Sequence, residues 1–391
     1  MAKKQIDEKD KIDQRSILKE LRTSINKDSA DKITWDLTKD DSPTHIKNWI
    51  STGSTILDYT ISNMRNGGIP CGKITELQGE ESAGKSLLAT HVLANTQKLG
   101  GIAVLLDTEN AFNTEFATRV GVNLVDLIYV QPGTIEECFE VIEGIIKTVR
   151  AKSQDQLITI VWDSVGNTPP KDEIEGDYNP NSRMGLGAKA MAKGLRMITS
   201  MIGREQITMI FTQPLTYKMD AGLYGDPFGT KYGKALPYHA SIRLRLVAST
   251  KLKDKDDSIY GLVTSARIIK SRLGTSHRKC KFEIHFDHGI DDETSWFQFL
   301  NDNGLIVKKG GWCYIPAIPS GKICDKGVDA GKDLGFLFRE AEFGKICKEN
   351  ETVKNWALDE LEKHLVKKYD DERPVREGVE ITKELEALLD E

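Results

Sequence analysis

Short apolar runs alternate with helix-like segments through the middle of the chain. The runs lie at 101–107, 156–163 and 206–213. Continuous apolar runs of this length are typical of parallel strands that are buried on both faces. Segments with helical spacing separate them, at 84–99, 134–151 and 186–203. The alternation predicts an α/β fold whose core is a doubly wound, mainly parallel sheet with right-handed crossovers.

The pattern changes on both sides of this core. Residues 1–48 are polar and charged, with weak helical spacing at Ile12, Ile17, Leu18 and Leu21. They predict a helical arm with a short extended piece near 33–37; a disordered tail is the alternative. Three later runs alternate apolar and polar residues and predict antiparallel strands with one face in water. These runs lie at 241–247, 264–270 and 279–286.

A second change near residue 290 predicts a small α/β appendage. A strand is expected at 312–316 and an acidic helix at 381–391. The predicted organisation is therefore an N-terminal helical arm (1–48), an α/β core (49–290) and a C-terminal appendage (291–391).

Composition restricts the location of the chain more than its function. The sequence has 391 residues and a net charge of −5, which neither indicates nor excludes a nucleic-acid partner. No stretch approaches the roughly 20 apolar residues of a membrane span, and the charged N-terminus lacks the apolar centre of a signal peptide. The six cysteines are scattered without a C-x-x-C pair. We expect a cytoplasmic protein without disulfides, structural zinc or membrane contact.

One glycine-rich loop carries a specific chemical signal. Gly79-x-x-x-x-Gly84-Lys85-Ser86 matches the Walker A pattern and stands between an apolar run and a helical segment. Its backbone N–H groups would surround the phosphates of ATP, Lys85 would reach the β- and γ-phosphates, and the Ser86 hydroxyl would bind Mg²⁺. The predicted nucleotide-binding residues are Gly79, Glu80, Glu81, Ser82, Ala83, Gly84, Lys85 and Ser86.

Three polar residues follow the apolar runs of the core. Asp163 closes the run L-I-T-I-V-W-D and would hold the metal as a Walker B acid. Glu109 and Gln213 end two further runs, and all three should meet beyond the carboxyl ends of the strands. Glu109 is the candidate base that orients the attacking water, with Asp107 as the competing acid. Gln213 would sense the γ-phosphate and relay its presence to the loop behind it.

Walker A and B residues alone would fit a kinase, a helicase, a transporter ATPase or a recombinase. The chain from about Ile50 to Ile290 resembles the RecA family of ATP-dependent DNA strand-exchange proteins, and seven segments carry the resemblance. They are S-T-G-S-T-I-L-D (51–58), G-G-I-P-C-G-K-I-T-E-L-Q-G-E-E-S-A-G-K-S (67–86), D-T-E-N-A-F (107–112), W-D-S-V-G-N-T-P-P-K-D-E-I-E-G-D (162–177), M-G-L-G-A-K-A-M (184–191), A-L-P-Y-H-A-S-I-R-L (235–244) and I-I-K-S-R (268–272).

The resemblance implies an ATP-dependent recombinase. Such a protein forms a helical filament on single-stranded DNA, hydrolyses ATP to ADP and phosphate when DNA is bound, and exchanges strands with homologous duplex DNA. A single-strand-binding protein and a loader are further expected partners. The short N-terminus and divergent C-terminal part are similar to the phage-type (UvsX) branch, in the cytosol of a bacterial or phage-infected cell. Two alternatives stay open, a hexameric helicase motor and a filament scaffold with little ATPase activity.

The family also has two loops that line a DNA groove, and here they match 175–186 and about 214–234. Both segments hold aromatic and basic residues, which supply π-faces for bases and charge for phosphates. Met184 falls where the family places an apolar wedge, and Lys189 and Arg196 fall where it places phosphate contacts. The predicted DNA-binding residues are Arg183, Met184, Lys189, Arg196, Lys218, Phe228, Lys231 and Lys234.

Two cations and two cleft residues complete the inference from resemblance. Lys270 and Arg272 match positions that reach the γ-phosphate of the neighbouring subunit, which would place ATP at the interface of a head-to-tail filament. Asn113 and Phe116 stand where an aspartate and a tyrosine commonly border the adenine, so we expect Phe116 at the base. The catalytic set is then Lys85, Glu109, Gln213, Lys270 and Arg272.

Overall fold

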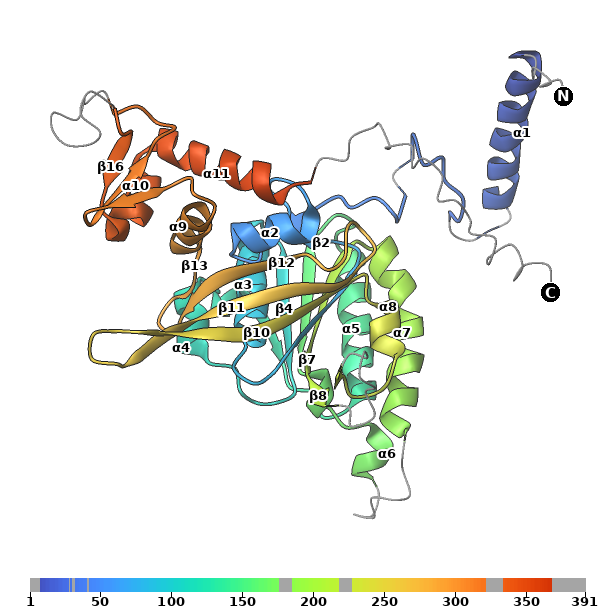
Figure 1. The fold of residues 1–391 in the computed structure, drawn as a ribbon. Helices are drawn as coiled ribbons and strands as arrows, with labels where there is room; N and C mark the ends of the chain where they lie inside the picture. The colour runs from blue at the N-terminus through green and yellow to red at the C-terminus, as the bar shows by residue number, and fades with distance from the viewer. Residues whose placement is uncertain are drawn as a thin grey trace, which may run out of the picture.

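The computed structural model of the chain describes residues 8–27, 29, 32–40, 42–175, 185–217, 227–320 and 333–367 (Figure 1). Arg183, Met184, Lys218 and the predicted helix at 381–391 lie outside the described residues. Within these ranges, no helix is long and apolar enough to span a membrane. The five described cysteines are buried and unpaired.

One large sheet forms the centre of the molecule. Among the described residues it has nine strands, in the order β13-β12-β11-β10-β3-β7-β6-β4-β5. The six strands from β10 to β5 run parallel, and β11, β12 and β13 continue the sheet antiparallel. The strands are β3 (Ile74–Gly79), β4 (Ile102–Asp107), β5 (Leu127–Val130), β6 (Ile158–Asp163), β7 (Ile207–Pro214), β10 (Ile242–Lys253), β11 (Ile259–Ser271), β12 (Lys279–His285) and β13 (Gly289–Asp291). The predicted fold class, an α/β core built on a mainly parallel sheet, is confirmed.

Strand β10 differs from its sequence-based prediction. The run 241–247 was expected to be purely antiparallel, but β10 pairs parallel with β3 on one side and antiparallel with β11 on the other. Its apolar residues Ile242, Leu244 and Leu246 are buried, whereas Arg243 and Arg245 are partly exposed. A strand with alternating apolar and polar residues can therefore lie inside the sheet when one of its faces is buried and the other is partly open to water.

Helices cover both faces of the sheet, which gives it two apolar cores. On one face, α3 (Lys85–Lys98) and α2 (Thr55–Ser62) pack against the strands, and α4 (Thr114–Val120) packs against α3. On the other, α5 (Ile135–Arg150) and α7 (Leu186–Arg204) bury the apolar stripe of each helix. In α5 this stripe contains Ile135, Cys138, Phe139, Ile142 and Ile146, the spacing of an amphipathic helix.

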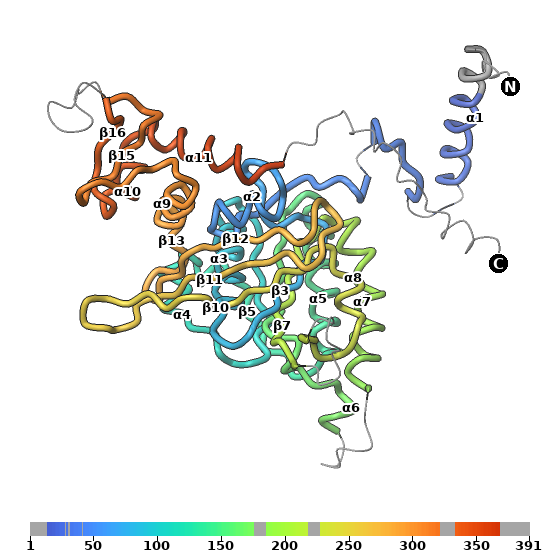
Figure 2. Tube along the Cα trace, viewed as in Figure 1, coloured from blue at the N-terminus to red at the C-terminus, as the bar shows by residue number. Residues whose placement is uncertain are grey.

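Elements at the two ends extend the core. The N-terminal helix α1 (Glu8–Lys27) stands apart from the sheet in Figures 1 and 2 and exposes Ile17, Leu18, Leu21 and Ile25. After β13 come a helical layer and a small sheet of order β14-β15-β16. These elements are α9 (Asp292–Asp302), β14 (Val307–Lys309), β15 (Trp312–Ile315), β16 (Phe336–Phe338), α10 (Phe343–Glu349) and α11 (Glu351–Leu365). The predicted strand at 312–316 is confirmed by β15.

Two buried carboxyl groups lie where the core meets these C-terminal elements. Asp58 accepts hydrogen bonds from the Ser51 hydroxyl (2.6 Å) and from the Thr52 N–H (2.8 Å). Asp292 accepts from the backbone and hydroxyl of Thr55 at 2.8 and 2.6 Å. Burial outweighs these hydrogen bonds and raises the pKa of Asp58 and of Asp292 to about 7 each.

The contribution of Asp58 and Asp292 to the unfolding free energy is expected to fall as the pH rises from about 4 to about 7. In this window the folded state keeps protons on Asp58 and Asp292 that the unfolded state, with an aspartate pKa of 3.8, releases. Each carboxyl contributes a slope of about −1.4 kcal/mol per pH unit. Asp58→Asn should therefore flatten the pH dependence of urea unfolding between pH 5 and 7, whereas Asp155→Asn, at an exposed site, should not. An unchanged slope in Asp58→Asn would contradict the assignment.

Candidate functional site

The Walker A loop joins β3 to α3 at the carboxyl edge of the sheet. Gly84 adopts a φ of 93° as the residue before the helix, and a Cβ atom there would lie 2.6 Å from Ile284 Cδ1. A Cβ atom at Gly79 would lie 2.8 Å from the Leu246 carbonyl oxygen, so both glycines are required by the close approach of the loop. The Lys85 ammonium donates to the carbonyl oxygens of Gly79 (3.0 Å) and Glu80 (2.8 Å).

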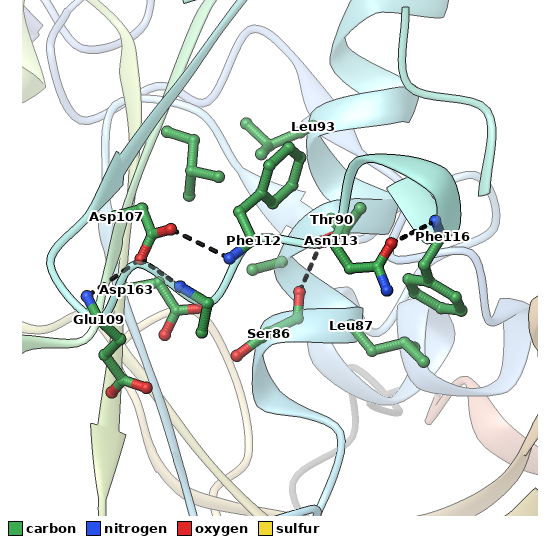
Figure 3. Close-up of a pocket in the computed structure, with 13 residues that line it drawn as sticks. Ser86, Leu87, Thr90, Leu93, Asp107, Glu109, Phe112, Asn113, Phe116 and Asp163 are labelled. Atoms are coloured by element: carbon green, nitrogen blue, oxygen red, sulfur yellow. Dashed lines mark hydrogen bonds between the residues drawn. The ribbon is translucent and has the colours of Figure 1, made fainter. Parts of the chain in front are cut away.

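Burial and three nearby carboxylates act on Lys85 in opposite directions. Burial lowers the pKa of Lys85, and the carboxylates of Asp163, Glu109 and Glu81 act in the opposite direction. Asp163 and Glu109, two of the three residues predicted to meet, line one cleft with Ser86, whereas the third, Gln213, is not among the residues that line it. In Figure 3, Ser86, Asp163 and Glu109 lie at the same end of the cleft.

Ser86 and Asp163 bring a hydroxyl and a carboxylate together. Burial raises the pKa of Asp163, and hydrogen bonds from Thr212 and Ser86 partly offset that effect. Thr212 donates to one carboxylate oxygen of Asp163. A hydroxyl beside a partly buried carboxylate is the donor set that a hard cation such as Mg²⁺ prefers, so these residues fit the predicted metal site.

The two candidate bases differ in their surroundings. Glu109 accepts hydrogen bonds at one carboxylate oxygen from the Ser164 hydroxyl and from the Asn167 amide (2.7 Å). Buried Asp107 instead accepts from the backbone N–H groups of Glu109 (3.0 Å) and Phe112 (3.1 Å) and from a tyrosine hydroxyl. Asp107 thus holds the turn that carries Glu109, whereas Glu109 keeps an oxygen available for a water molecule.

A cleft of about 250 Å³ continues from these acids along α3 (Figure 3). At its far end it is lined by Leu87, Asn113 and Phe116. Asn113 caps α4 because its side-chain oxygen accepts from the Phe116 N–H at 2.9 Å. The Asn113 side-chain oxygen is thus used by this hydrogen bond. The Phe116 ring borders the cleft, where a nucleotide base could stack on it.

Gln213 lies near the carboxyl end of β7 and is fully buried. Its side-chain amide donates to the carbonyl oxygen of Lys231 at 3.0 Å, and its own carbonyl oxygen is buried without a hydrogen-bond partner. A Cβ atom on Gly166 would lie 3.7 Å from that oxygen. The predicted link from the strand end to the second loop is present as a hydrogen bond.

Five of the predicted DNA-binding residues lie in the described part of the chain. Lys189 and Arg196 are exposed on α7, and Lys231 and Lys234 are exposed beside α8 (Ala235–His239). Phe228, in the short strand β9 (Phe228–Gly229), is partly buried with Arg245 5.2 Å above its ring. A groove of about 590 Å³ runs from Phe228 and Lys234 past Arg243 and Arg245 to Lys270.

Lys270 and Arg272 do not face the nucleotide cleft of their own chain. The Lys270 ammonium donates to the carbonyl oxygens of Pro237 (2.8 Å) and Tyr238 (2.9 Å), and Arg272 donates to Tyr238 (2.8 Å). Burial, followed by the neighbouring Arg272, lowers the pKa of Lys270 to about 8. Lys270 pairs with Arg243 in the sheet, and Arg243 is level with Glu76 near the amino end of β3. The Walker A loop leaves the opposite end of that strand.

The sequence analysis did not identify the hydrogen-bond partners that position the predicted acidic residues. Ser164 and Asn167 donate hydrogen bonds to Glu109, which is more than fifty residues earlier in the chain. Thr212, on the neighbouring strand β7, donates a hydrogen bond to Asp163. Tyr129 likewise reaches Asp107 from β5. The one signal available was position, because Ser164 and Asn167 directly follow the Walker B strand.

The fold and this site define a P-loop nucleoside triphosphatase whose phosphate loop, candidate metal-binding acid and candidate base lie at one edge of a parallel sheet. Comparison with known proteins takes the definition further. Residues 16–291 match the family model of the RecA N-terminal domain. The chain is 36% identical over 263 residues to Protein RecA of Desulforapulum autotrophicum, covering 67% of this chain and 72% of that protein.

Two further relatives give the same result. Protein RecA of Leptospira meyeri is 36% identical over 265 residues, 68% of this chain and 65% of that protein. Protein RecA of Trichodesmium erythraeum is 35% identical over 263 residues, 67% of this chain and 69% of that protein. The chain belongs to the RecA family. It spans 65% to 72% of the length of these three relatives.

Family membership gives the activity class, an ATP-dependent recombinase with DNA-dependent ATPase activity that acts in recombination and repair. The matched region begins at residue 16, inside α1, so it includes most of the N-terminal arm, which sequence inspection had left outside the resemblance. It ends at residue 291, where α9 and the C-terminal elements begin.

Proposed function

We propose that this chain binds ATP with Mg²⁺ in the cleft beside α3, assembles into a filament on single-stranded DNA and pairs that strand with homologous duplex. The observation that supports it most is the convergence of Lys85, Asp163 and Glu109 beside the Walker A loop, with Gln213 hydrogen-bonded to the second DNA loop. ATP would be cleaved by a water molecule that Glu109 orients, and Lys85 and the metal would stabilise charge on the γ-phosphate.

In this proposal Ser86 and Asp163 hold Mg²⁺, and the metal neutralises phosphate charge when it is bound. Phe116 borders the base at the other end of the cleft. Gln213 changes partners with the γ-phosphate and thereby orders or releases the loop at Lys231, an order–disorder switch. Phe228, Lys231 and Lys234, with Lys189 and Arg196 on α7, contact the single strand, as do Arg183, Met184 and Lys218 outside the described residues.

We further propose that Lys270 and Arg272 act on the ATP of the next subunit. Their place near the amino end of β3 supports this, because the phosphate loop of the same chain leaves the other end of that strand. A head-to-tail contact would bring the two ends together, and repeated contacts of that kind build a helical filament. The exposed apolar residues of α1 are suited to packing on the adjacent subunit.

Mixing two inactive variants tests this arrangement in trans. Lys85→Ala and the double variant Lys270→Ala/Arg272→Ala should each lose ATP turnover. In an equimolar mixture, about a quarter of the interfaces join an intact phosphate loop to an intact pair of cations, because the contact is heterologous. Turnover should therefore return to about that fraction of the wild-type rate. A mixture as inactive as its components, although both form filaments, would place the two cations elsewhere.

The recombinase function itself is tested by strand exchange between circular single-stranded DNA and a linear duplex. Joint molecules should form with ATP and a homologous duplex, and a duplex of unrelated sequence is the control. A DNA-stimulated ATPase without joint molecules would favour a helicase motor or a filament scaffold.

Three narrower proposals follow from the sequence. We propose the phage-type (UvsX) branch from the sequence alone, on the short charged N-terminus and the divergent C-terminal part. The division into arm, core and appendage at residues 48 and 290 is supported by the pattern changes there. A single-strand-binding protein, a loader and a cytosolic location remain expectations, which co-purification from the host cell would test.

A further inference from the structure

Tyr232 occupies a junction between three functional segments. Its hydroxyl donates to the backbone carbonyl oxygen of Thr168 at 2.7 Å. Its ring packs against the first turn of α7, where a Cβ atom on Gly187 would clash with it. The preceding residue, Lys231, supplies the carbonyl oxygen that receives the Gln213 amide. One side chain thus contacts the turn beyond the Walker B strand and the helix that follows the first loop.

The backbone at this position is costly. Tyr232 has a φ of 61°, in the left-handed region that non-glycine residues rarely adopt. Such a conformation persists only where surrounding contacts fix it, and it often marks a functional segment. Burial raises the pKa of Tyr232 to about 12, so its hydroxyl remains a hydrogen-bond donor at neutral pH.

Thr168 connects this tyrosine to the candidate base. Its hydroxyl accepts from the buried indole of Trp162 (2.9 Å) and donates to the hydroxyl of Thr108 (3.0 Å), the residue before Glu109. The residue before Thr168 in the chain, Asn167, donates a hydrogen bond from its side-chain amide to the Glu109 carboxylate at 2.7 Å. The segment 164–168, which includes the short helix η2 (Val165–Asn167), therefore touches the tyrosine at one end and holds Glu109 along its length.

We propose that Tyr232 is a positioning residue that couples DNA binding at the second loop to Glu109. This inference rests on the proposed roles of Glu109 and of the loop. DNA held by the neighbouring exposed Lys231 and Lys234 fixes the loop end, the tyrosine hydroxyl fixes residues 164–168, and the side chains of Ser164 and Asn167 then hold the carboxylate of Glu109 in place. In this inference, DNA binding strengthens the hold of the tyrosine hydroxyl on residues 164–168, and so on Glu109, relative to the protein without DNA.

Tyr232→Phe tests the coupling because it removes one hydroxyl and keeps the ring. We measure ATP turnover at saturating ATP, with and without saturating single-stranded DNA, together with DNA affinity. The ratio of the two turnover rates should fall about fivefold, the worth of one neutral hydrogen bond, with a DNA Kd within about twofold of wild type. Tyr260→Phe, at an exposed tyrosine on the β10–β11 hairpin, is the matched control and should keep the ratio.

A double variant separates positioning from a general structural effect. If Tyr232 acts through residues 164–168, adding Tyr232→Phe to Asn167→Ala should lower the ratio no further than Asn167→Ala alone. Additive losses, or a weakened DNA Kd with an unchanged ratio at saturation, would overturn the inference. So would a Tyr232→Phe protein that is stimulated as strongly as wild type. A wild-type protein that DNA does not stimulate would instead defeat the proposed function.

Discussion

Lys85→Ala should lower ATP turnover by about a thousandfold, one of the two largest effects expected of a single substitution in this chain. The ammonium of Lys85 lies against the carbonyl oxygens of Gly79 and Glu80, inside the loop that would surround the phosphates. From there it would stabilise the negative charge that develops on the γ-phosphate. Removing one such donor from a preorganised site lowers kcat by about a hundredfold to a thousandfold. Steady-state release of phosphate with DNA present measures the effect.

Lys98→Ala is the matched control for this prediction. Lys98 is the last residue of α3, the helix that begins at Lys85, and its side chain is exposed. Its ammonium donates a hydrogen bond to the Asn95 side chain and does not contact the Walker A loop. Its loss should leave turnover within about twofold of wild type, as for most surface substitutions. A Lys85→Ala protein that retained a tenth of wild-type turnover would show that this loop is not the catalytic phosphate site.

Glu109→Gln should lower turnover by about a hundredfold to ten-thousandfold and leave ATP binding intact. The glutamine oxygen can still accept from Ser164 and Asn167, so the turn keeps its shape. It cannot take a proton from water, and positioned acid–base groups contribute factors of that size. ATP should therefore bind without being cleaved, and the variant should stay in long-lived filaments on DNA. Turnover at saturating ATP and the affinity for a fluorescent ATP analogue measure the two effects separately.

Asp107→Asn distinguishes the two candidate bases. Because Asp107 accepts hydrogen bonds from the backbone at Glu109 and Phe112, its amide replacement should disturb the turn and lower protein stability. We expect a lower melting temperature and weaker ATP binding, with turnover at saturating ATP less affected than in Glu109→Gln. The reverse order, with Glu109→Gln fully active, would assign the base role to Asp107.

The sequence predicted the parts of the fold that depend on local pattern. The runs at 101–107, 156–163 and 206–213 became β4, β6 and β7 because continuous apolar strands are stable only between two layers of helices. The pairing of β10 was not predictable in this way. Alternation shows which side chains face water but does not show which strand lies alongside.

The sequence predicted those site residues that belong to a motif or lie at the end of a strand. It did not predict hydrogen-bond partners that are far apart in the sequence. Asp163 and Glu109 were found because parallel strands end at one edge of the sheet. Ser164 and Asn167 were not found as partners of Glu109, since a hydrogen bond across 55 or 58 residues leaves no spacing pattern. Tyr232 lies within the segment matched to the second loop, but its contact with Thr168 leaves no sequence signal and appears only in three dimensions.

The most direct test of the central claim is ATP hydrolysis by the full chain with and without single-stranded DNA, with the same samples imaged by electron microscopy. The account predicts strong stimulation by DNA together with helical filaments on it, because the second loop is hydrogen-bonded to Gln213 at the end of β7. Closed rings in place of filaments, or filaments whose ATP turnover is unaffected by DNA, would contradict it.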